Sequence, residues 1–160
     1  MKHFVEIRDI KDEEVYYVRK FGHYNETAPL AFSELCLFVK NHNMALPDVN
    51  SNIKLIGIAH DNPCIKEDKK CRFDFCITVT KVVPLEGDVN LQTIRGGKYA
   101  VFIHKGPYQN LAPLFHAICE DWLPNSNYKK RDLPMFQVYL NDWQKVKPED
   151  LLAEIYLPIE

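Results

Sequence analysis

The stretch Gly106-Pro107-Tyr108 repeats Gly22-His23-Tyr24 at an offset in numbering of 106 − 22 = 84. In both places the motif stands between a run rich in β-branched and aromatic residues, which is typical of a strand, and a run with helical spacing. Carried back towards the start of the chain, the same offset aligns Ile7 with Leu91. The 160 residues therefore contain two copies of one structural unit.

Each copy also contains an acidic residue inside an otherwise apolar strand. Towards the end of the copies the offset becomes slightly smaller, as loops of unequal length would cause, and Asp74 becomes equivalent to Glu154 because 154 − 74 = 80. Two copies of one unit packed side by side leave a groove along their pseudo-twofold axis. We therefore expect a central ligand groove, with the acidic residues beside it.

The order of elements in each copy is two strands, a helix and two further strands. The expected strands are 5–10, 15–21, 54–60 and 72–80 in the first copy and 89–94, 98–105, 136–141 and 152–159 in the second, with helices at 27–41 and about 111–122. An amphipathic helix buries its apolar stripe against the nearest sheet. We predict an α+β fold of duplicated strand–helix–strand–strand modules, with antiparallel sheets that carry helices on one face.

The length is suited to one core of ordinary size. We therefore predict a single domain over residues 1–160, built from two repeats at about 1–82 and 88–160.

Alternation along the last strand predicts which side chains meet in the site, because successive strand residues point to opposite faces. Ala153, Ile155 and Leu157 should face the core, while Glu154 and Tyr156 should face the groove.

The same reasoning applied to residues 136–141 buries Phe136, Val138 and Leu140 and turns Tyr139 the other way. We therefore expect Tyr139, Tyr156 and Glu154 to share one site.

Composition limits the possible partners and the compartment. A net charge of −2 indicates no basic face for nucleic acid or an anionic membrane, so neither partner is expected. The N-terminus lacks the apolar run of a signal peptide, and no stretch is long and apolar enough for a membrane span. Five cysteines without a CxxC pair indicate reduced thiols. These features predict a cytoplasmic protein.

Motifs for other chemistries do not occur. The six histidines show no HExxH pattern and no Cys/His metal spacing. GxGxxG turns, P-loops and GxSxG elbows are also missing from the sequence. We therefore expect no metal and no cofactor.

Several stretches resemble the GyrI-like effector-binding domain, which occurs alone in bacterial DNA gyrase inhibitors and fused to DNA-binding domains in AraC- and MerR-type multidrug regulators. The matching stretches are 17–24, 57–63, 96–108, 122–124, 139–142 and 154–158. Together they cover almost the whole chain in the family's order. The sequence departs from the family at Ala59, where an aromatic residue is common, and at Trp143, where a proline is common.

The resemblance implies a central groove that binds lipophilic, often cationic, small molecules, with an acidic residue matching Glu154 among aromatic residues at its floor. Glu154 would supply charge complementarity to a delocalised cation. Tyr139, Tyr156 and Tyr108 would add cation–π contacts, worth roughly 0.5–2 kcal/mol each. Tyr17 and Asp74 are further candidates for ligand contacts, although Asp74 has the alternative role of accepting hydrogen bonds within the fold.

Two other functions remain open from the sequence. Some stand-alone relatives hydrolyse electrophilic cyclopropane-containing toxins, which here would need Glu154 as general base and a tyrosine such as Tyr139 to position the electrophile. The gyrase-inhibitor relatives suggest a protein partner, DNA gyrase or a regulator. Small-molecule capture is the leading hypothesis.

Overall fold

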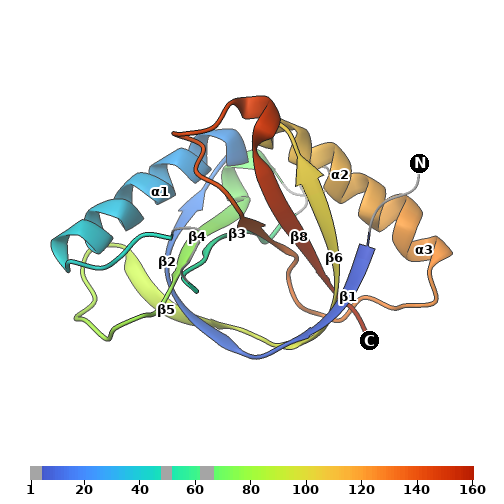
Figure 1. Cartoon of the computed structure of the whole chain (residues 1–160), viewed down its shortest axis with the longest axis horizontal. Helices are drawn as coiled ribbons and strands as arrows, with labels where there is room; N and C mark the ends of the chain where they lie inside the picture. The colour runs from blue at the N-terminus through green and yellow to red at the C-terminus, as the bar shows by residue number, and fades with distance from the viewer. Residues whose placement is uncertain (1–4, 48–51, 62–66) are drawn as a thin grey trace. The chain divides into compact units, whose positions relative to one another are not determined.

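The computed structural model of the chain describes residues 5–47, 52–61 and 67–160 (Figure 1). The chain forms two compact units: unit 1 contains residues 1–11 and 96–160, and unit 2 contains residues 12–95. Each unit is a four-stranded antiparallel sheet with helical structure packed on one face. The predicted α+β class is confirmed.

Unit 2 has the strand order β5-β2-β4-β3. Its elements are β2 (Glu13–Phe21), α1 (Tyr24–Asn41), β3 (Leu55–Ala59), η1 (Asp68–Lys70), β4 (Arg72–Thr78) and β5 (Val89–Ile94). The apolar stripe of α1 packs on the sheet through aromatic pairs: the Tyr16 and Phe38 ring centroids lie 5.1 Å apart, and those of Phe32 and Phe75 lie 5.0 Å apart.

Unit 1 has the strand order β1-β6-β8-β7. Its elements are β1 (Val5–Ile10), β6 (Gly97–Lys105), η2 (Tyr108–Asn110), α2 (Leu111–Ala117), the π-helical turn η3 (Ile118–Trp122), α3 (Leu123–Asn125), β7 (Phe136–Tyr139), η4 (Pro148–Asp150) and β8 (Leu152–Pro158). The predicted core residues of the last strand, Ala153, Ile155 and Leu157, are fully buried. They pack with Phe102 and Ile118 beneath the helical segment.

The repeat extends over whole elements. The helical segment of unit 1 runs from 108 to 125, which reproduces the bounds of α1 at the offset of the glycine motif, since 24 + 84 = 108 and 41 + 84 = 125. It is therefore longer at both ends than the helix predicted at 111–122. Strand β8 reproduces the bounds of β4 at the smaller offset, since 72 + 80 = 152 and 78 + 80 = 158.

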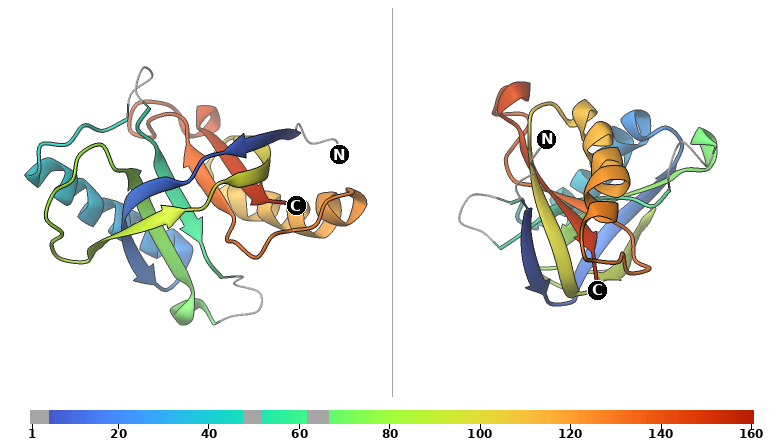
Figure 2. Two further views of the ribbon diagram at one scale, coloured as in Figure 1. Left: turned by 90° about the horizontal axis from the view of Figure 1, so that it is seen from below. Right: turned by 90° about the vertical axis from the view of Figure 1, so that its right-hand side faces the viewer.

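The first strand of each repeat pairs with the second strand of the other repeat. Strand β1 pairs with β6, and β5 pairs with β2; Figure 2 shows β1 and β6 running side by side. The compact units therefore differ from the sequence repeats by the exchange of these first strands. That the two units form a single domain, with a groove along a pseudo-twofold axis, stays a prediction.

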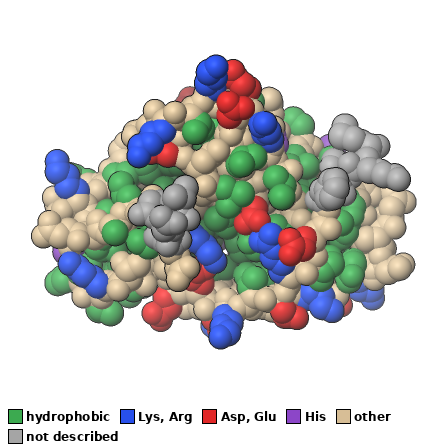
Figure 3. Space-filling model, in the orientation of Figure 1, with side chains coloured by type: hydrophobic (Ala, Val, Ile, Leu, Met, Phe, Trp, Pro, Cys, Tyr) green, Lys and Arg blue, Asp and Glu red, His purple; other side chains and the backbone are tan. Residues whose placement is uncertain are grey.

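Acidic and basic side chains are interspersed over the face drawn in Figure 3. Over the whole sequence 20 Lys and Arg residues stand against 22 Asp and Glu residues. Among the residues that the structure describes, no helix has the length and apolar character that crossing a membrane requires.

The glycine of the repeated motif has a conformational reason. Gly22 and Gly106 follow β2 and β6 with φ of 142° and 131°, in the region that favours glycine. Their backbone N–H groups donate to Cys71 O at 2.9 Å and to Leu151 O at 2.8 Å, which are equivalent positions. The motif thus closes each strand ladder and redirects the chain into the helix.

We predict that Gly22→Ala and Gly106→Ala each lower the free energy of unfolding by about 1–3 kcal/mol, because a side chain strains this backbone conformation. The matched control is Gly87→Asn. Its φ of 59° lies in the left-handed helical region that asparagine tolerates, and nothing lies within 4 Å of an added Cβ. Urea unfolding of the three variants provides the measurement. Equal stability of Gly106→Ala and Gly87→Asn would contradict the explanation.

Candidate functional site

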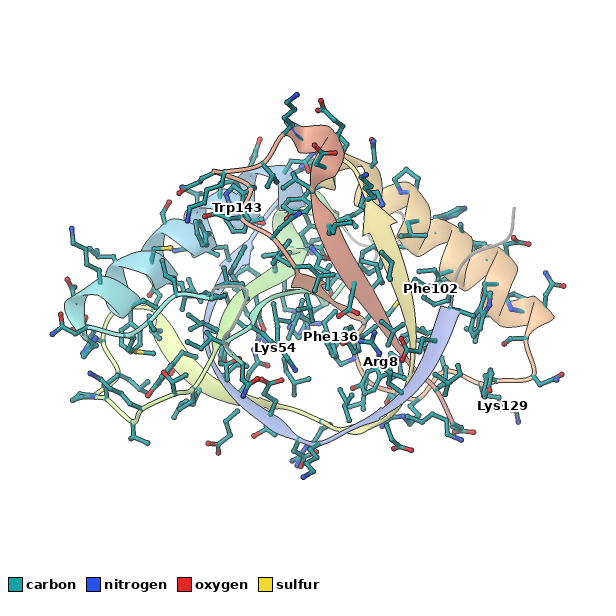
Figure 4. The ribbon with its side chains drawn as sticks, viewed as in Figure 1. Arg8, Lys54, Phe102, Lys129, Phe136 and Trp143 are labelled. Carbon is teal, nitrogen blue, oxygen red and sulfur yellow. The ribbon has the colours of Figure 1, made fainter. Side chains whose placement is uncertain are left out.

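Each sheet has a helix face, on which its helical segment packs, and an opposite face that carries an acidic residue. We call the latter the acid face. In unit 1 it carries Glu154 and Tyr156 of β8, and residues directly opposite each other in paired strands share a face. Val138 lies opposite Glu154, and Phe136 lies opposite Tyr156, so β7 also contributes to this face. Figure 4 labels Phe136 and Arg8 from this face and Phe102 from the helix face.

Glu154 is bound by two neighbours on the acid face of unit 1. Arg8 Nη2 lies 2.8 Å from Glu154 Oε2, and the Tyr156 hydroxyl donates to Glu154 Oε1 at 3.2 Å. Arg8 Nη1 donates to the Tyr156 hydroxyl oxygen at 2.9 Å, which closes a triangle of contacts. The Glu154 side chain is only 12% exposed, so this triangle supplies partners that solvent would otherwise provide.

Aromatic rings form the apolar part of the same face. The rings of Phe136 and Tyr156 are stacked, with centroids 4.7 Å apart and planes 12° apart. Tyr99 contacts both rings edge-on, at 5.4 Å from Phe136 and 5.9 Å from Tyr156. The guanidinium carbon of Arg8 lies 5.9 Å from the Tyr156 ring centroid, within cation–π range. Unit 1 therefore combines a carboxylate with three aromatic rings.

The charges around Glu154 favour an ionised Arg8 and a neutral Tyr156. Burial and the nearby Glu154 carboxylate raise the pKa of Tyr156 to about 12. Hydrogen bonds to Glu6 and Glu154 raise the pKa of Arg8. Arg8 Nη2 lies between the two carboxylates, at 2.9 Å from Glu6 Oε2 and 2.8 Å from Glu154 Oε2.

Asp74 on the acid face of unit 2 is held entirely by side chains of its own unit. Arg19 contacts it with two nitrogens, Nε at 2.7 Å and Nη2 at 2.9 Å. His60 Nε2 lies 2.7 Å from Asp74 Oδ2, and Gln92 Nε2 donates to the same oxygen at 2.9 Å. Burial alone would raise the pKa of Asp74, but these hydrogen bonds outweigh it and lower the pKa to about 2.

The Asp74 side chain has no exposed surface, and both of its oxygens already have partners. We predicted Asp74 as a ligand contact. That role stays a prediction, and the contacts with Arg19, His60 and Gln92 fit the alternative role, in which hydrogen bonds within the fold satisfy a buried charge.

Equivalent positions in the two units differ in their side chains. The offsets match Gln92 with Arg8 and Cys76 with Tyr156, since 8 + 84 = 92 and 76 + 80 = 156. In unit 2 Gln92 lies beside both Asp74 and Cys76, as Arg8 lies beside Glu154 and Tyr156 in unit 1. Ile56 likewise stands where unit 1 has Phe136. The reverse holds for Tyr17, which matches Val101 because 17 + 84 = 101.

The structure separates Tyr139 from Glu154, contrary to the prediction that they share a site. Tyr139 lies opposite Ala153, which places it on the helix face. There its ring packs 5.1 Å from that of Tyr108 and 5.7 Å from that of Trp143. Tyr108 therefore also lies apart from Glu154, and burial together with the charge of Asp142 raises its pKa to about 12.

Tyr139 was assigned to the wrong face of β7 because the apolar residues next to it were expected to form the core face. Phe136, Val138 and Leu140 were predicted to be buried on the side away from Glu154. Phe136 and Val138 are buried, but they lie on the acid face, and Leu140 is 45% exposed. The apolar residues Phe136 and Val138 alternate with the polar Gln137, but all three are buried, so this alternation does not show which face of β7 packs beneath the helix. Only the register with β8 decides them.

Tyr17 lies on the acid face of unit 2, opposite Cys76. The guanidinium carbon of Arg19 lies 5.5 Å from its ring centroid. Its role as a ligand contact stays a prediction.

Sequence reasoning missed Arg8, Tyr99 and Phe136. A signal for Arg8 was present, since alternation over residues 5–10 places Glu6 and Arg8 on one face and the offset of the glycine motif aligns Arg8 with Gln92. The contact with Glu154 could not be derived, because it depends on the exchange of first strands between the repeats.

Comparisons with known proteins agree with this architecture. A family model described as a GyrI-like small molecule binding domain matches residues 3–160. The probable transcriptional regulator YgiV of Escherichia coli is 30% identical over 115 residues, which are 71% of each protein. A DNA gyrase inhibitor of Escherichia fergusonii is 27% identical over 158 residues, which are 96% of each protein.

Solved structures show the same fold at lower identity. The C-terminal domain of EcmrR matches with a TM-score of 0.80 at 21% identity, covering 100% of this chain and 99% of that one. In the EcmrR–DNA complex this chain spans only 57% of the EcmrR chain. SAV2435, solved with bound tetraphenylphosphonium, matches with a TM-score of 0.60 at 15% identity, covering 98% and 94% of the two chains.

The depressed pKa of Asp74 predicts acid sensitivity. A carboxylate with a folded-state pKa of about 2 and an ordinary value of 3.8 adds stability above pH 4 that disappears as the pH falls through 2. We expect the stability advantage of wild type over Asp74→Asn to shrink by about 2 kcal/mol between pH 5 and pH 2.

Urea unfolding at several pH values measures this difference. Asp88→Asn is the control, because Asp88 is 67% exposed and its only described ion pair is the contact of 3.3 Å with Lys20. Parallel pH profiles for wild type and Asp74→Asn would show that Asp74 does not carry this part of the stability.

Proposed function

Because the chain belongs to the GyrI-like small-molecule-binding family, we propose that it captures lipophilic cations on the acid face of unit 1. The residues that would form the site are Glu154, Tyr156, Phe136 and Tyr99. We infer a cytoplasmic sensor or scavenger, which binds its ligand without altering it.

The observation that carries this proposal is the position of the Arg8 guanidinium. It pairs with Glu154 at 2.8 Å and lies over the Tyr156 ring at 5.9 Å. These are the two contacts that a delocalised organic cation needs from a protein, charge neutralisation and the face of an aromatic ring. The surroundings of Glu154 are therefore chemically suited to a large, weakly hydrated cation.

The aromatic rings explain why the ligand should also be lipophilic. Phe136 and Tyr99 are 4% and 1% exposed, so a ligand that reaches these rings would transfer its own apolar surface from water into an apolar environment. Burial of apolar surface contributes about 25 cal/mol per Å². Such contacts have little directional demand, which predicts tolerance of many ligand shapes rather than selectivity for one.

The relatives support the same class of ligand. SAV2435 has been solved with tetraphenylphosphonium, a lipophilic monocation. EcmrR carries a domain of this fold in a protein that binds DNA. The two cases are consistent with ligand capture either alone or as the input to a regulator.

The geometry favours binding over hydrolysis. A general base needs an oxygen directed at a water molecule. Here Oε2 of Glu154 is paired with Arg8, and Oε1 accepts from Tyr156. Tyr139, which would have positioned the electrophile, lies on the helix face.

We predict that the protein binds tetraphenylphosphonium and that Glu154→Gln weakens binding, because the variant removes the unit of negative charge that the cation neutralises. One charge-assisted contact is worth roughly 1.5 kcal/mol, so the loss should be at most about tenfold. Isothermal titration calorimetry provides the affinities. Glu120→Gln removes an exposed carboxylate from the same unit and should leave the affinity unchanged.

Mass spectrometry of the recovered ligand separates capture from catalysis. Strained electrophiles should be recovered intact along with the cations. Hydrolysis that depends on Glu154 would replace the binding proposal with an enzymatic one, and equal affinity in wild type and Glu154→Gln would remove Glu154 from the site.

A further inference from the structure

We propose that Arg8 is a built-in competitor of cationic ligands, which must displace its guanidinium from Glu154 towards Glu6 before they bind. This inference rests on the proposed function and names the residue that sets the charge selectivity of the site. Arg8 is then a gate whose two positions are defined by two carboxylates.

The first support is that Arg8 makes the contacts a cationic ligand would make. Its guanidinium pairs with Glu154 Oε2 at 2.8 Å, donates to the Tyr156 hydroxyl oxygen at 2.9 Å and lies within cation–π distance of the Tyr156 ring. A ligand cannot use the same carboxylate oxygen and the same side of the ring while Arg8 stays there. Binding of a cationic ligand to Glu154 and the Arg8–Glu154 ion pair therefore exclude each other.

The second support is that Arg8 has another acceptor within reach. The nitrogen that contacts Glu154, Nη2, also lies 2.9 Å from Glu6 Oε2. The Glu6 side chain is 64% exposed, whereas that of Glu154 is 12% exposed. Arg8 can therefore leave Glu154 and keep an ion pair at the surface, while β1 stays in its ladder with β6.

The charges define the ligand class. Glu6, Arg8 and Glu154 together carry one positive and two negative charges, which leaves one unit of negative charge unmatched. When Arg8 pairs with Glu6 alone, a monocation at Glu154 gives each carboxylate one partner. The cluster thus favours monocations, and Arg8 limits their affinity because its pair with Glu154 must first be broken.

The repeat supplies a matched comparison. The position equivalent to Arg8 is Gln92, which donates to Asp74 at 2.9 Å. In unit 2 the positive charge comes instead from Arg19, which stands opposite Asp74 on the adjacent strand β2. Glutamine at this place in the fold is therefore compatible with a neighbouring carboxylate, which makes Arg8→Gln a conservative test.

The test uses two probes of similar shape and opposite charge, tetraphenylphosphonium and tetraphenylborate. We expect Arg8→Gln to strengthen tetraphenylphosphonium binding by about tenfold, because the charge-assisted contact of Arg8 with Glu154 no longer competes with the cation. The same variant should weaken tetraphenylborate binding, because the site loses a positive charge. Glu6→Gln should weaken phosphonium binding, because Arg8 then has no outer partner. Titration calorimetry of full-length protein measures each affinity.

Two controls separate a charge effect from damage to the fold. Lys98→Gln removes one positive charge from an exposed position of β6 and should change neither affinity. Arg8→Lys keeps the charge and should stay close to wild type. Structural damage would lower the affinities for both probes, whereas displacement of Arg8 moves them in opposite directions.

The outcomes distinguish this inference from the proposed function. Phosphonium binding that depends on Glu154 but is equal or weaker in Arg8→Gln overturns the gate and leaves the binding proposal standing. The absence of phosphonium binding in wild type and in Arg8→Gln overturns both. Binding in Arg8→Gln that exceeds wild type, together with weaker borate binding, supports the gate.

Discussion

The pairing of a carboxylate placed inside an apolar strand is the constraint on which both units depend. Burying an unpaired carboxylate is costly, so each unit must bring a cation or several hydrogen-bond donors to it. Unit 2 encloses Asp74 with Arg19, His60 and Gln92 and leaves it no exposed surface. In unit 1, Glu154 is partly exposed, pairs with Arg8 and accepts a hydrogen bond from Tyr156.

These two solutions leave the two carboxylates in different surroundings. Both carboxylate oxygens of Asp74 have hydrogen-bond partners within unit 2. Glu154 lies beside stacked aromatic rings and is held by an arginine that also reaches the surface through Glu6. The two equivalent acidic positions thus have different surroundings: Asp74 is enclosed by its partners, whereas Glu154 belongs to the proposed ligand site.

The exchange of first strands connects the fold to this chemistry. Strand β1 pairs with β6, and it carries Arg8 to the acid face of unit 1. Strand β5 pairs with β2 and delivers Gln92 to Asp74. A change in either first strand would therefore act on the acidic residue of the other repeat, because each first strand lies in the sheet that contains that residue.

The sequence by itself determined the order of strands and helices, the α+β class and the alignment of Asp74 with Glu154, because periodicity and repeated glycine motifs can be found without knowledge of distant contacts. It also identified the core face of β8. Only the tertiary structure decided that Arg8 meets Glu154, that Phe136 rather than Tyr139 lies on the acid face, and that Asp74 is enclosed. The reason is that strand partners and register are set by contacts between distant segments. Where both faces of a strand are buried, as in β7, the alternation of apolar and polar residues does not show which face meets the helix.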